Sequence, residues 1–171
     1  MDDINRLLAK AGRGDGAALE SLYRQLGNGV YCLALSILGE KGAAEDVLQE
    51  TFVRVWTMAH THSPGKSGRS WILAIARNLC LDRLRAAQNA GPSQEGEEER
   101  SGSEALSFVD NLELKDALGK LEEQARKIVV LHLAAGFKFR EIAALLGEKQ
   151  SRVQRAYYAG VEQLSAYYTI Q

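Results

Sequence analysis

The residues best suited to chemistry in this sequence lie near its C-terminal end, where Lys149, Arg152, Gln154 and Arg155 follow a glycine-containing turn. Arginine pairs with guanine, and glutamine with adenine, through two hydrogen bonds, whereas lysine suits a phosphate group. This set of residues therefore indicates a surface that reads double-stranded DNA. For the segment taken alone, an ordinary helical hairpin with a solvated charged face is the alternative.

Two helices must position these side chains. The first, over residues 139–146, is expected to end at Gly147, and Ser151 is expected to cap the second, because a serine oxygen accepts hydrogen bonds from the free amides of a first helical turn. This layout is typical of a helix-turn-helix, whose second helix enters the major groove. Spacings of three and four predict the buried stripe of that second helix: Val153, Tyr157, Val161 and Leu164.

The sequence carries no motif for catalysis. Enzymes need a nucleophile with a base, a set of metal ligands or a phosphate-binding loop, and no Walker loop, GxGxxG or GxSxG occurs here. His60 and His62 lie in a loop with no cysteine or carboxylate near them in the sequence, so we expect no metal site. Cys32 and Cys80 lie in apolar helical segments, which predicts two buried thiols and a reducing compartment. We therefore expect neither an enzyme nor a bound cofactor.

Four helices are expected in the first half of the chain, over residues 4–11, 17–38, 43–59 and 70–87. Apolar side chains at steps of three and four predict the buried stripe of the second: Leu19, Leu22, Tyr23, Leu26, Val30, Leu33 and Ile37. The third is expected to bury one side, made of Val47, Leu48, Thr51, Phe52 and Val55. Another side of it offers a polar and acidic surface to a partner: Asp46, Gln49, Glu50 and Val53. The fourth is expected to bury Trp71, Ile72, Ile75 and Leu79 and to expose Arg77, Asn78, Arg83 and Arg85.

Composition and charge divide the chain into two helical domains. The 171 residues are 46% hydrophobic and 25% charged, the proportions of a globular protein, and the net charge is −1. Residues 88–107 hold one basic and five acidic side chains and no apolar periodicity, so we interpret them as a flexible acidic linker between residues 1–87 and 108–171. Helices are also expected over residues 109–118 and 121–135. Because all of these segments have helical periodicity, we predict an all-α fold. No apolar run is long enough to span a membrane, and no signal peptide is apparent, so we predict a cytoplasmic protein.

Three segments together resemble a known family. The chain is similar, nearly end to end, to the extracytoplasmic-function sigma factors of the bacterial sigma-70 family. Residues 46–56 (DVLQETFVRVW) resemble the helix of region 2 that binds core RNA polymerase, and residues 70–78 (SWILAIARN) resemble the segment that melts and reads the −10 promoter element. Leu118, residues 121–126 and residues 141–143 resemble region 4, which binds the −35 element. All three motifs, in this order and with an acidic linker between them, are highly specific.

The resemblance implies a role for each segment. The third helix would dock on the clamp coiled coil of the polymerase β′ subunit through Asp46, Gln49, Glu50, Val53 and Trp56. The loop over residues 60–68 would hold a flipped base of the −10 element, with DNA contacts from Lys66, Arg69, Arg77, Asn78, Arg83 and Arg85. The −35 element would contact Lys149, Ser151, Arg152, Gln154 and Arg155. The linker would pass through core polymerase, towards the RNA exit path.

The second helix of the helix-turn-helix departs from the family pattern. The family places a proline-containing turn and the residues GTVKSR after Leu-Gly, whereas this chain has EKQSRVQRA after Gly147. An ungapped alignment matches Val153 to the family valine, and a four-residue deletion would instead align residues 151–152; we prefer the ungapped version because it preserves the turn length. The paired tyrosines at 157–158 and 167–168 are unusual too, as core, DNA-stacking or partner contacts.

The resemblance implies a sigma factor that binds core RNA polymerase, through its β and β′ subunits, and directs it to promoter DNA. It implies no catalytic activity, and an anti-sigma factor is an expected partner. The altered second helix leaves one alternative: a sigma-like regulatory interaction protein with impaired −35 recognition. A membrane-inserted protein is not expected.

Overall fold

The computed structural model describes residues 3–90, 112–133 and 136–169. The chain forms two compact units, one on each side of residues 91–111. Beyond residue 90, the predicted linker lies outside the described residues. All of the residues that the sequence assigns to DNA lie within the described ranges.

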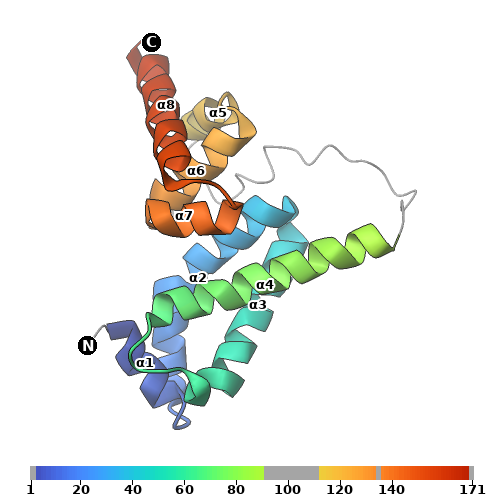
Figure 1. Ribbon diagram of the computed structural model, residues 1–171, viewed down its shortest axis with the longest axis vertical. Helices are drawn as coiled ribbons and strands as arrows, with labels where there is room; N and C mark the ends of the chain where they lie inside the picture. The colour runs from blue at the N-terminus through green and yellow to red at the C-terminus, as the bar shows by residue number, and fades with distance from the viewer. Residues whose placement is uncertain (1–2, 91–111, 134–135, 170–171) are drawn as a thin grey trace. The chain divides into compact units, whose positions relative to one another are not determined.

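Every regular element in the described part of the chain is a helix, which confirms the all-α prediction (Figure 1). The first unit contains α1 (Asp3–Ala11), α2 (Gly16–Leu38), α3 (Lys41–Met58), the short 3-10 helix η1 (Ala59–Thr61) and α4 (Gly68–Asn89). The second unit contains α5 (Leu112–Gly119), α6 (Glu123–Leu133), α7 (Phe139–Leu146) and α8 (Gln150–Thr169).

The core of the first unit lies where α2 packs against α1 and α4. Its fully buried side chains include Leu8, Leu22, Leu33 and Ile72. The predicted stripes are confirmed in part, because Leu19, Ile37, Trp71 and Ile75 are only half-buried. Tyr23 departs most from the prediction, because it is 46% exposed although the sequence places it in the buried stripe of α2. Two consecutive helical residues point about 100° apart, and at this level of α2 the neighbouring helices cover Leu22 but not Tyr23.

Helix α1 braces the loop that precedes α4. The Asn5 side-chain oxygen accepts a hydrogen bond from the Gly68 amide at 2.7 Å. At the other end of α1, Gly12 lies so close to η1 that a Cβ would come within 3.0 Å of the His60 nitrogen. The Ser67 hydroxyl then caps α4 by accepting a hydrogen bond from the Ser70 amide at 3.2 Å. The loop is therefore held at both ends by short polar contacts and close backbone packing.

Replacing Gly68 with alanine is expected to destabilise the first unit by about 1–3 kcal/mol, because the added Cβ overpacks a closed junction. It would lie 2.6 Å from both the Asn5 side-chain oxygen and a Leu8 methyl carbon. Gly65→Ala in the same loop is the matched control, since nothing lies within 4 Å of a Cβ there. Urea unfolding followed by tryptophan fluorescence reports on this unit, which holds both tryptophans, Trp56 and Trp71. Equal midpoints for the two variants would contradict the packing.

The two cysteines are buried and unpaired, as the sequence predicts: Cys32 lies on α2 and Cys80 on α4. Burial raises the pKa of the Cys32 thiol from 9.0 to about 11 and that of the Cys80 thiol to about 12. Both thiols are therefore protonated and weakly nucleophilic at neutral pH.

The free energy of unfolding is expected to fall as the pH rises above about 9. The unfolded thiols lose their protons near pH 9.0, whereas the folded ones retain them up to about pH 11 and 12, so the unfolded chain binds fewer protons in that window. This contribution to stability is fully present below pH 9. Iodoacetamide at pH 8 should alkylate both thiols in guanidinium and neither in the native chain. Rapid native labelling would show that the thiols are accessible.

The second unit packs α8 against α5, α6 and α7. Leu118, Leu121, Val129 and Val130 form a buried cluster, which Tyr157 and Leu164 of α8 cover. Gly160 allows α8 to approach α6 closely, because a Cβ there would lie 3.0 Å from a Val129 methyl carbon. The predicted stripe of α8 therefore faces the core, with a glycine contact that the apolar pattern did not reveal.

The turn between α7 and α8 has the predicted glycine but not the predicted cap. Gly147 adopts a left-handed conformation (φ 66°), and the Glu148 amide donates to the Ala143 carbonyl at 2.9 Å, closing α7. Helix α8 begins at Gln150, so Ser151 lies within its first turn, and the prediction that Ser151 caps the helix is wrong. The Lys149 carbonyl instead accepts the Arg152 and Val153 amides, at 3.0 and 3.1 Å.

The C-terminal end of α8 is fastened to α5. The Tyr167 hydroxyl donates to an Asp116 carboxylate oxygen at 2.8 Å, and the Lys120 ammonium lies 4.3 Å from the centre of the Tyr167 ring. Hydrogen bonds from Tyr167 and Lys120 lower the pKa of Asp116. Tyr167 therefore serves as a contact within the unit.

Candidate functional site

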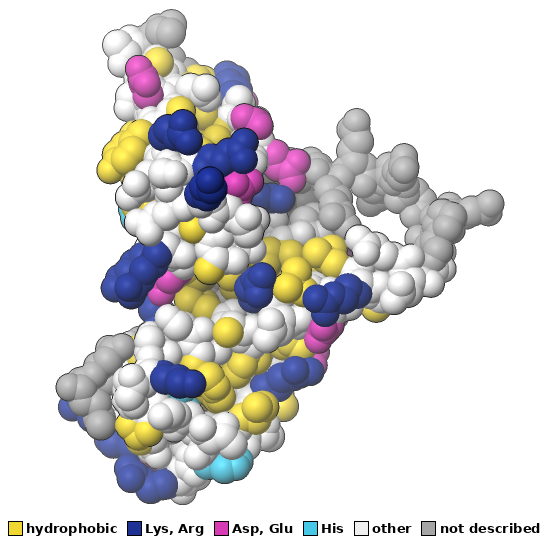
Figure 2. All heavy atoms as spheres, in the orientation of Figure 1, with side chains coloured by type: hydrophobic (Ala, Val, Ile, Leu, Met, Phe, Trp, Pro, Cys, Tyr) yellow, Lys and Arg dark blue, Asp and Glu magenta, His cyan; other side chains and the backbone are white. Residues whose placement is uncertain are grey.

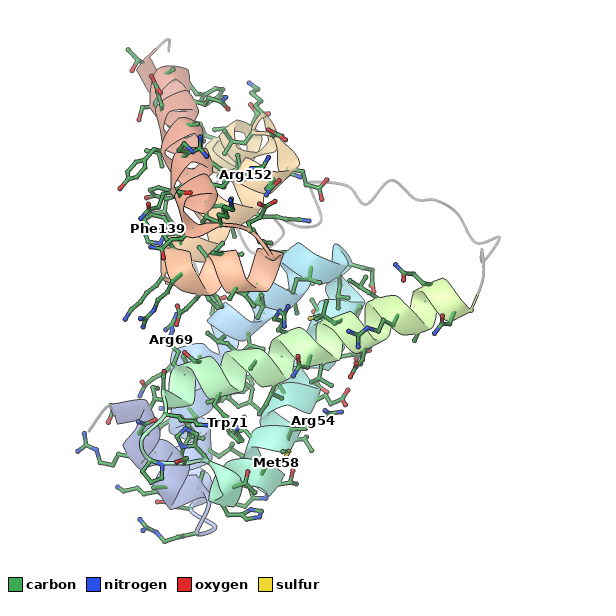
Figure 3. All side chains as sticks on the ribbon, in the orientation of Figure 1. Arg54, Met58, Arg69, Trp71, Phe139 and Arg152 are labelled. Carbon is green, nitrogen blue, oxygen red and sulfur yellow. The ribbon has the colours of Figure 1, made fainter. Side chains whose placement is uncertain are left out.

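The first candidate surface is the outer face of α3, which we define as Asp46, Gln49, Glu50, Val53 and Trp56. On the opposite side of the helix, Val47, Thr51, Phe52 and Val55 are buried as predicted, whereas Leu48 is only half-buried. On the outer face, Val53 is 61% exposed and Trp56 is 39% exposed. Arg54 and Met58 also project from α3 (Figure 3). An apolar residue and an aromatic residue next to carboxylates make a surface suited to a protein partner.

Ion pairs link this face to α4. The Arg83 guanidinium lies 3.7 Å from an Asp46 carboxylate oxygen and 3.5 Å from one of Glu50. Glu50 also pairs with Arg54, one turn along α3, at 2.9 Å. The two carboxylates that the sequence assigns to a protein partner therefore contact a cation that it assigns to DNA.

A hollow of about 320 Å³ lies beside α3, on the side of α2. The exposed Tyr23 ring forms one edge and packs edge-on against Phe52 of α3, with ring centres 5.0 Å apart. Sequence reasoning missed this feature, because it placed Tyr23 in the core. The hollow is lined by Tyr23, Arg24, Gly27, Asn28, Tyr31 and Leu48.

The second candidate surface is the loop before α4 and the outer side of that helix. His62 packs against Trp71, with ring centres 5.4 Å apart, and Trp71 stands at the start of α4 (Figure 3). The Nε2 atom of His62 and the Nε atom of Arg77 are buried without a hydrogen-bond partner among the described residues. The loop is thus anchored by a ring contact, and the exposed Lys66 lies within it.

The predicted DNA residues of α4 do not form one patch. Asn78 and Arg85 are exposed and seven residues apart, so they share a face of the helix two turns from each other. Arg69 and Arg77 are half-buried, and Arg83 turns towards α3. Arg85 pairs with Asp82 of its own helix at 3.5 Å. The structure therefore separates Arg83 from the rest of the set.

The third candidate surface is the start of α8. Lys149, Ser151, Arg152 and Arg155 are exposed there and Gln154 is half-buried, so the structure presents all five predicted residues at one end of the helix. On the face shown in Figure 2, basic side chains gather over α8 and its neighbours, with acidic ones between them. Arg152 projects from the first turns of α8 (Figure 3), where Glu148 lies 3.4 Å from its guanidinium.

Aromatic packing holds α7 and α8 at a fixed angle. His132 of α6 stacks on Phe139, the first residue of α7, with ring centres 4.3 Å apart and planes inclined by 14°. Tyr157 packs edge-on against both rings. The His132 Nδ1 atom donates to the Phe137 carbonyl at 2.7 Å. Tyr157 is thus a core residue of the helix-turn-helix, whereas Tyr158 beside it is exposed.

No cation site and no membrane span accompany these surfaces in the described ranges. Among the residues described, no three His, Cys, Asp or Glu side chains are placed together to bind a metal ion. Within the same ranges, no helix combines the length and apolar character that crossing a bilayer requires.

Comparison with known proteins identifies two matching family models. Residues 22–90 match sigma-70 region 2, and residues 111–164 match sigma-70 region 4. The first match contains α3 and α4 with the loop between them, and the second contains α7 and most of α8. Helix α1, which braces the loop, precedes the first match.

Individual relatives are similar along most of this chain. The ECF RNA polymerase sigma factor BldN of Streptomyces coelicolor is 30% identical over 93% of this chain, and SigE of Mycolicibacterium smegmatis is 32% identical over 90%. The chain spans 63% and 64% of those two proteins, which is under two thirds of their length. SigL of Mycobacterium tuberculosis is 29% identical over 87% of this chain and 88% of its own length.

Two solved structures are similar in fold. CnrH, solved in complex with the cytosolic domain of CnrY, matches with a TM-score of 0.61 and 26% identity, and the match covers 99% of each chain. The sigma factor RpoE of Bartonella quintana, solved in complex with the anti-sigma factor NepR, matches with a TM-score of 0.58 and 19% identity. That match covers 89% of this chain and 97% of RpoE, and at this identity it concerns the fold alone.

Proposed function

Since the chain belongs to the extracytoplasmic-function group of the sigma-70 family, we propose that it binds core RNA polymerase and directs it to promoters. The observation that carries this proposal is the presence, in one chain, of an exposed apolar and acidic face on α3 and a cationic helix-turn-helix. The RNA-forming chemistry would belong to the polymerase, so we propose no catalytic residue, metal or cofactor in this chain. It would act in the cytoplasm, with the polymerase and the DNA.

The outer face of α3 is the proposed contact with the β′ subunit. Val53 and Trp56 supply exposed apolar area, and the carboxylates of Asp46 and Glu50 supply negative charge that favours a basic partner surface. Because these side chains project from one rigid helix, docking needs little ordering of the chain.

The loop before α4 and the outer side of α4 are the proposed contact with the −10 element. Extruding a base from the stack costs a few kcal/mol, so the receiving site must be held open in advance. The hydrogen bond between Asn5 and Gly68 and the ring contact between His62 and Trp71 support such a site. Lys66, Arg69, Arg77, Asn78 and Arg85 would contact the nearby strand.

The first turns of α8 are the proposed contact with the −35 element, through Lys149, Ser151, Arg152, Gln154 and Arg155. We also propose an anti-sigma factor as a partner, because RpoE was solved in complex with the anti-sigma factor NepR, and CnrH was solved in complex with the cytosolic domain of CnrY. We propose that residues 1–87 act on core polymerase and the −10 element and residues 108–171 on the −35 element; the matched spans, 22–90 and 111–164, support a division of this kind.

Run-off transcription tests the proposal. Purified core polymerase, with and without this chain, would transcribe fragments of the genome that encodes it. Discrete new transcripts with shared upstream elements are expected. Co-purification with core polymerase without any transcript would favour the regulatory alternative with impaired −35 recognition, and failure to bind core polymerase would overturn both.

A further inference from the structure

We propose that Arg83 is a positioning residue of the polymerase-binding surface: it holds the Asp46 and Glu50 carboxylates on the outer face of α3 and does not act as a contact with promoter DNA. The inference rests on the proposed function, because that proposal names core polymerase as the partner of this face. It changes the role of a residue that the sequence places among the DNA contacts.

The geometry of the guanidinium supports this role. One terminal nitrogen of Arg83 lies 3.7 Å from Asp46, and the other lies 3.5 Å from Glu50. Arginine presents its N–H groups in a planar fork, so a single side chain can address two carboxylates at once. A lysine ammonium is a compact point charge on a flexible stem and would not span them in the same way.

The two carboxylates need such a cation. Asp46 and Glu50 are four residues apart on α3, so their like charges lie on the same side of the helix and repel each other. Arg54 pairs with Glu50 from within α3, but its ion pair does not reach Asp46. Arg83 comes from α4 and fixes both side chains relative to a second helix. Removing rotamer freedom before docking lowers the entropy that binding must overcome.

A contact between Arg83 and DNA would break the ion pairs between α4 and α3, whereas a contact between Arg85 and DNA would leave them intact. To reach a phosphate, Arg83 would have to leave two carboxylates, and both would then stand beside the DNA without a cation from α4. Arg85 pairs only with Asp82 of its own helix among the ion pairs described, and its side chain is 70% exposed against 37% for Arg83. The geometry therefore divides these two arginines between different partners.

The test measures the affinity of the full-length chain for core polymerase in the absence of DNA. Arg83→Gln is expected to weaken this affinity by about three- to fivefold at low salt, the size of an exposed ion-pair effect, and by less at high salt. Arg6→Gln is the matched control, since it removes an exposed ion pair with Asp3 on α1, away from the surface. It should leave the affinity unchanged.

A double-mutant cycle separates positioning from a general effect on the fold. If Arg83 acts through Asp46, then Arg83→Gln and Asp46→Asn should be non-additive in their effects on core affinity, and Arg83→Lys should restore only part of the loss. Normal core affinity for Arg83→Gln, with weaker promoter binding by the assembled holoenzyme, would overturn the inference and return Arg83 to the DNA contacts. Additive effects would overturn it too. A wild-type chain that does not bind core polymerase would instead refute the proposed function.

Discussion

Replacing Val53 with aspartate is expected to weaken binding to core RNA polymerase by about thirtyfold or more, the effect of losing a central apolar contact worth about 2 kcal/mol. Val53 lies on the outer face of α3 and is 61% exposed in the free chain, so its side chain contributes little to the core of the first unit. In the complex the same position would be covered, and a carboxylate there would lose its hydration without gaining a partner. Transcription should fall in parallel.

The measurement is a titration of labelled chain with core polymerase, followed by fluorescence anisotropy. Val53→Ile keeps the apolar contact and is the matched control, with an expected affinity close to that of the wild type. Urea unfolding of both variants checks the fold, and midpoints near the wild-type value are expected for so exposed a position. If Val53→Asp binds core polymerase as tightly as Val53→Ile does, the outer face of α3 is not the docking surface.

The second large effect is expected at Arg155, whose replacement with alanine should weaken promoter binding by the holoenzyme about ten- to a hundredfold. Arg155 is exposed in the second turn of α8, and it forms no ion pair within the described part of the chain. Arg152 is also exposed, but its guanidinium lies 3.4 Å from Glu148. Arg152→Ala is therefore expected to have the smaller effect, because part of its charge is already balanced.

Salt dependence and base preference distinguish two modes of contact for Arg155. If Arg155 contacts a phosphate, Arg155→Ala should weaken binding to all promoters about equally and lower the slope of log K against log salt by about 1. If Arg155 reads a guanine, specificity should relax at one position of the −35 element. Arg155→Lys keeps the charge and loses the bidentate pairing, so it is the control for the first mode. Unchanged promoter binding by Arg155→Ala would exclude the start of α8 as the −35 contact.

Much of the fold follows from local pattern. Apolar residues at steps of three and four, together with Gly147 and the near absence of proline, predict the eight α-helices of the described ranges, and the bounds that lie within those ranges differ from the observed ones by a few residues. Four of the five side chains predicted to be buried on α3 are buried, because periodicity along an amphipathic helix largely decides which side faces the core; Leu48 is only half-buried. The helix η1 was not predicted, since a single 3-10 turn has no periodic signal.

The sequence-based predictions were wrong or incomplete where contacts between helices, or the exact start of a helix, decide the environment of a residue. Tyr23 and Leu22 both fit the apolar pattern of α2, and only packing against α1 and α4 decides which of them is buried. Ser151 fits the residue preference for a cap, but the backbone places the first helical residue at Gln150. Gly160 is not part of the apolar periodicity of α8, and its role depends on how closely α6 approaches it.

The sequence by itself determined the family, the helical class and the chemical types on each surface, because these depend on residue identity and spacing along one helix. The tertiary structure alone decided how residues far apart in the chain divide their roles. The Asn5 side chain accepts a hydrogen bond from the Gly68 amide, 63 residues away in the sequence. Arg83 pairs with Asp46 and Glu50 of α3, whereas the Arg85 side chain is largely exposed to solvent. Contacts of this kind depend on the angle and distance between helices, which packing of their buried faces sets and which local periodicity does not encode.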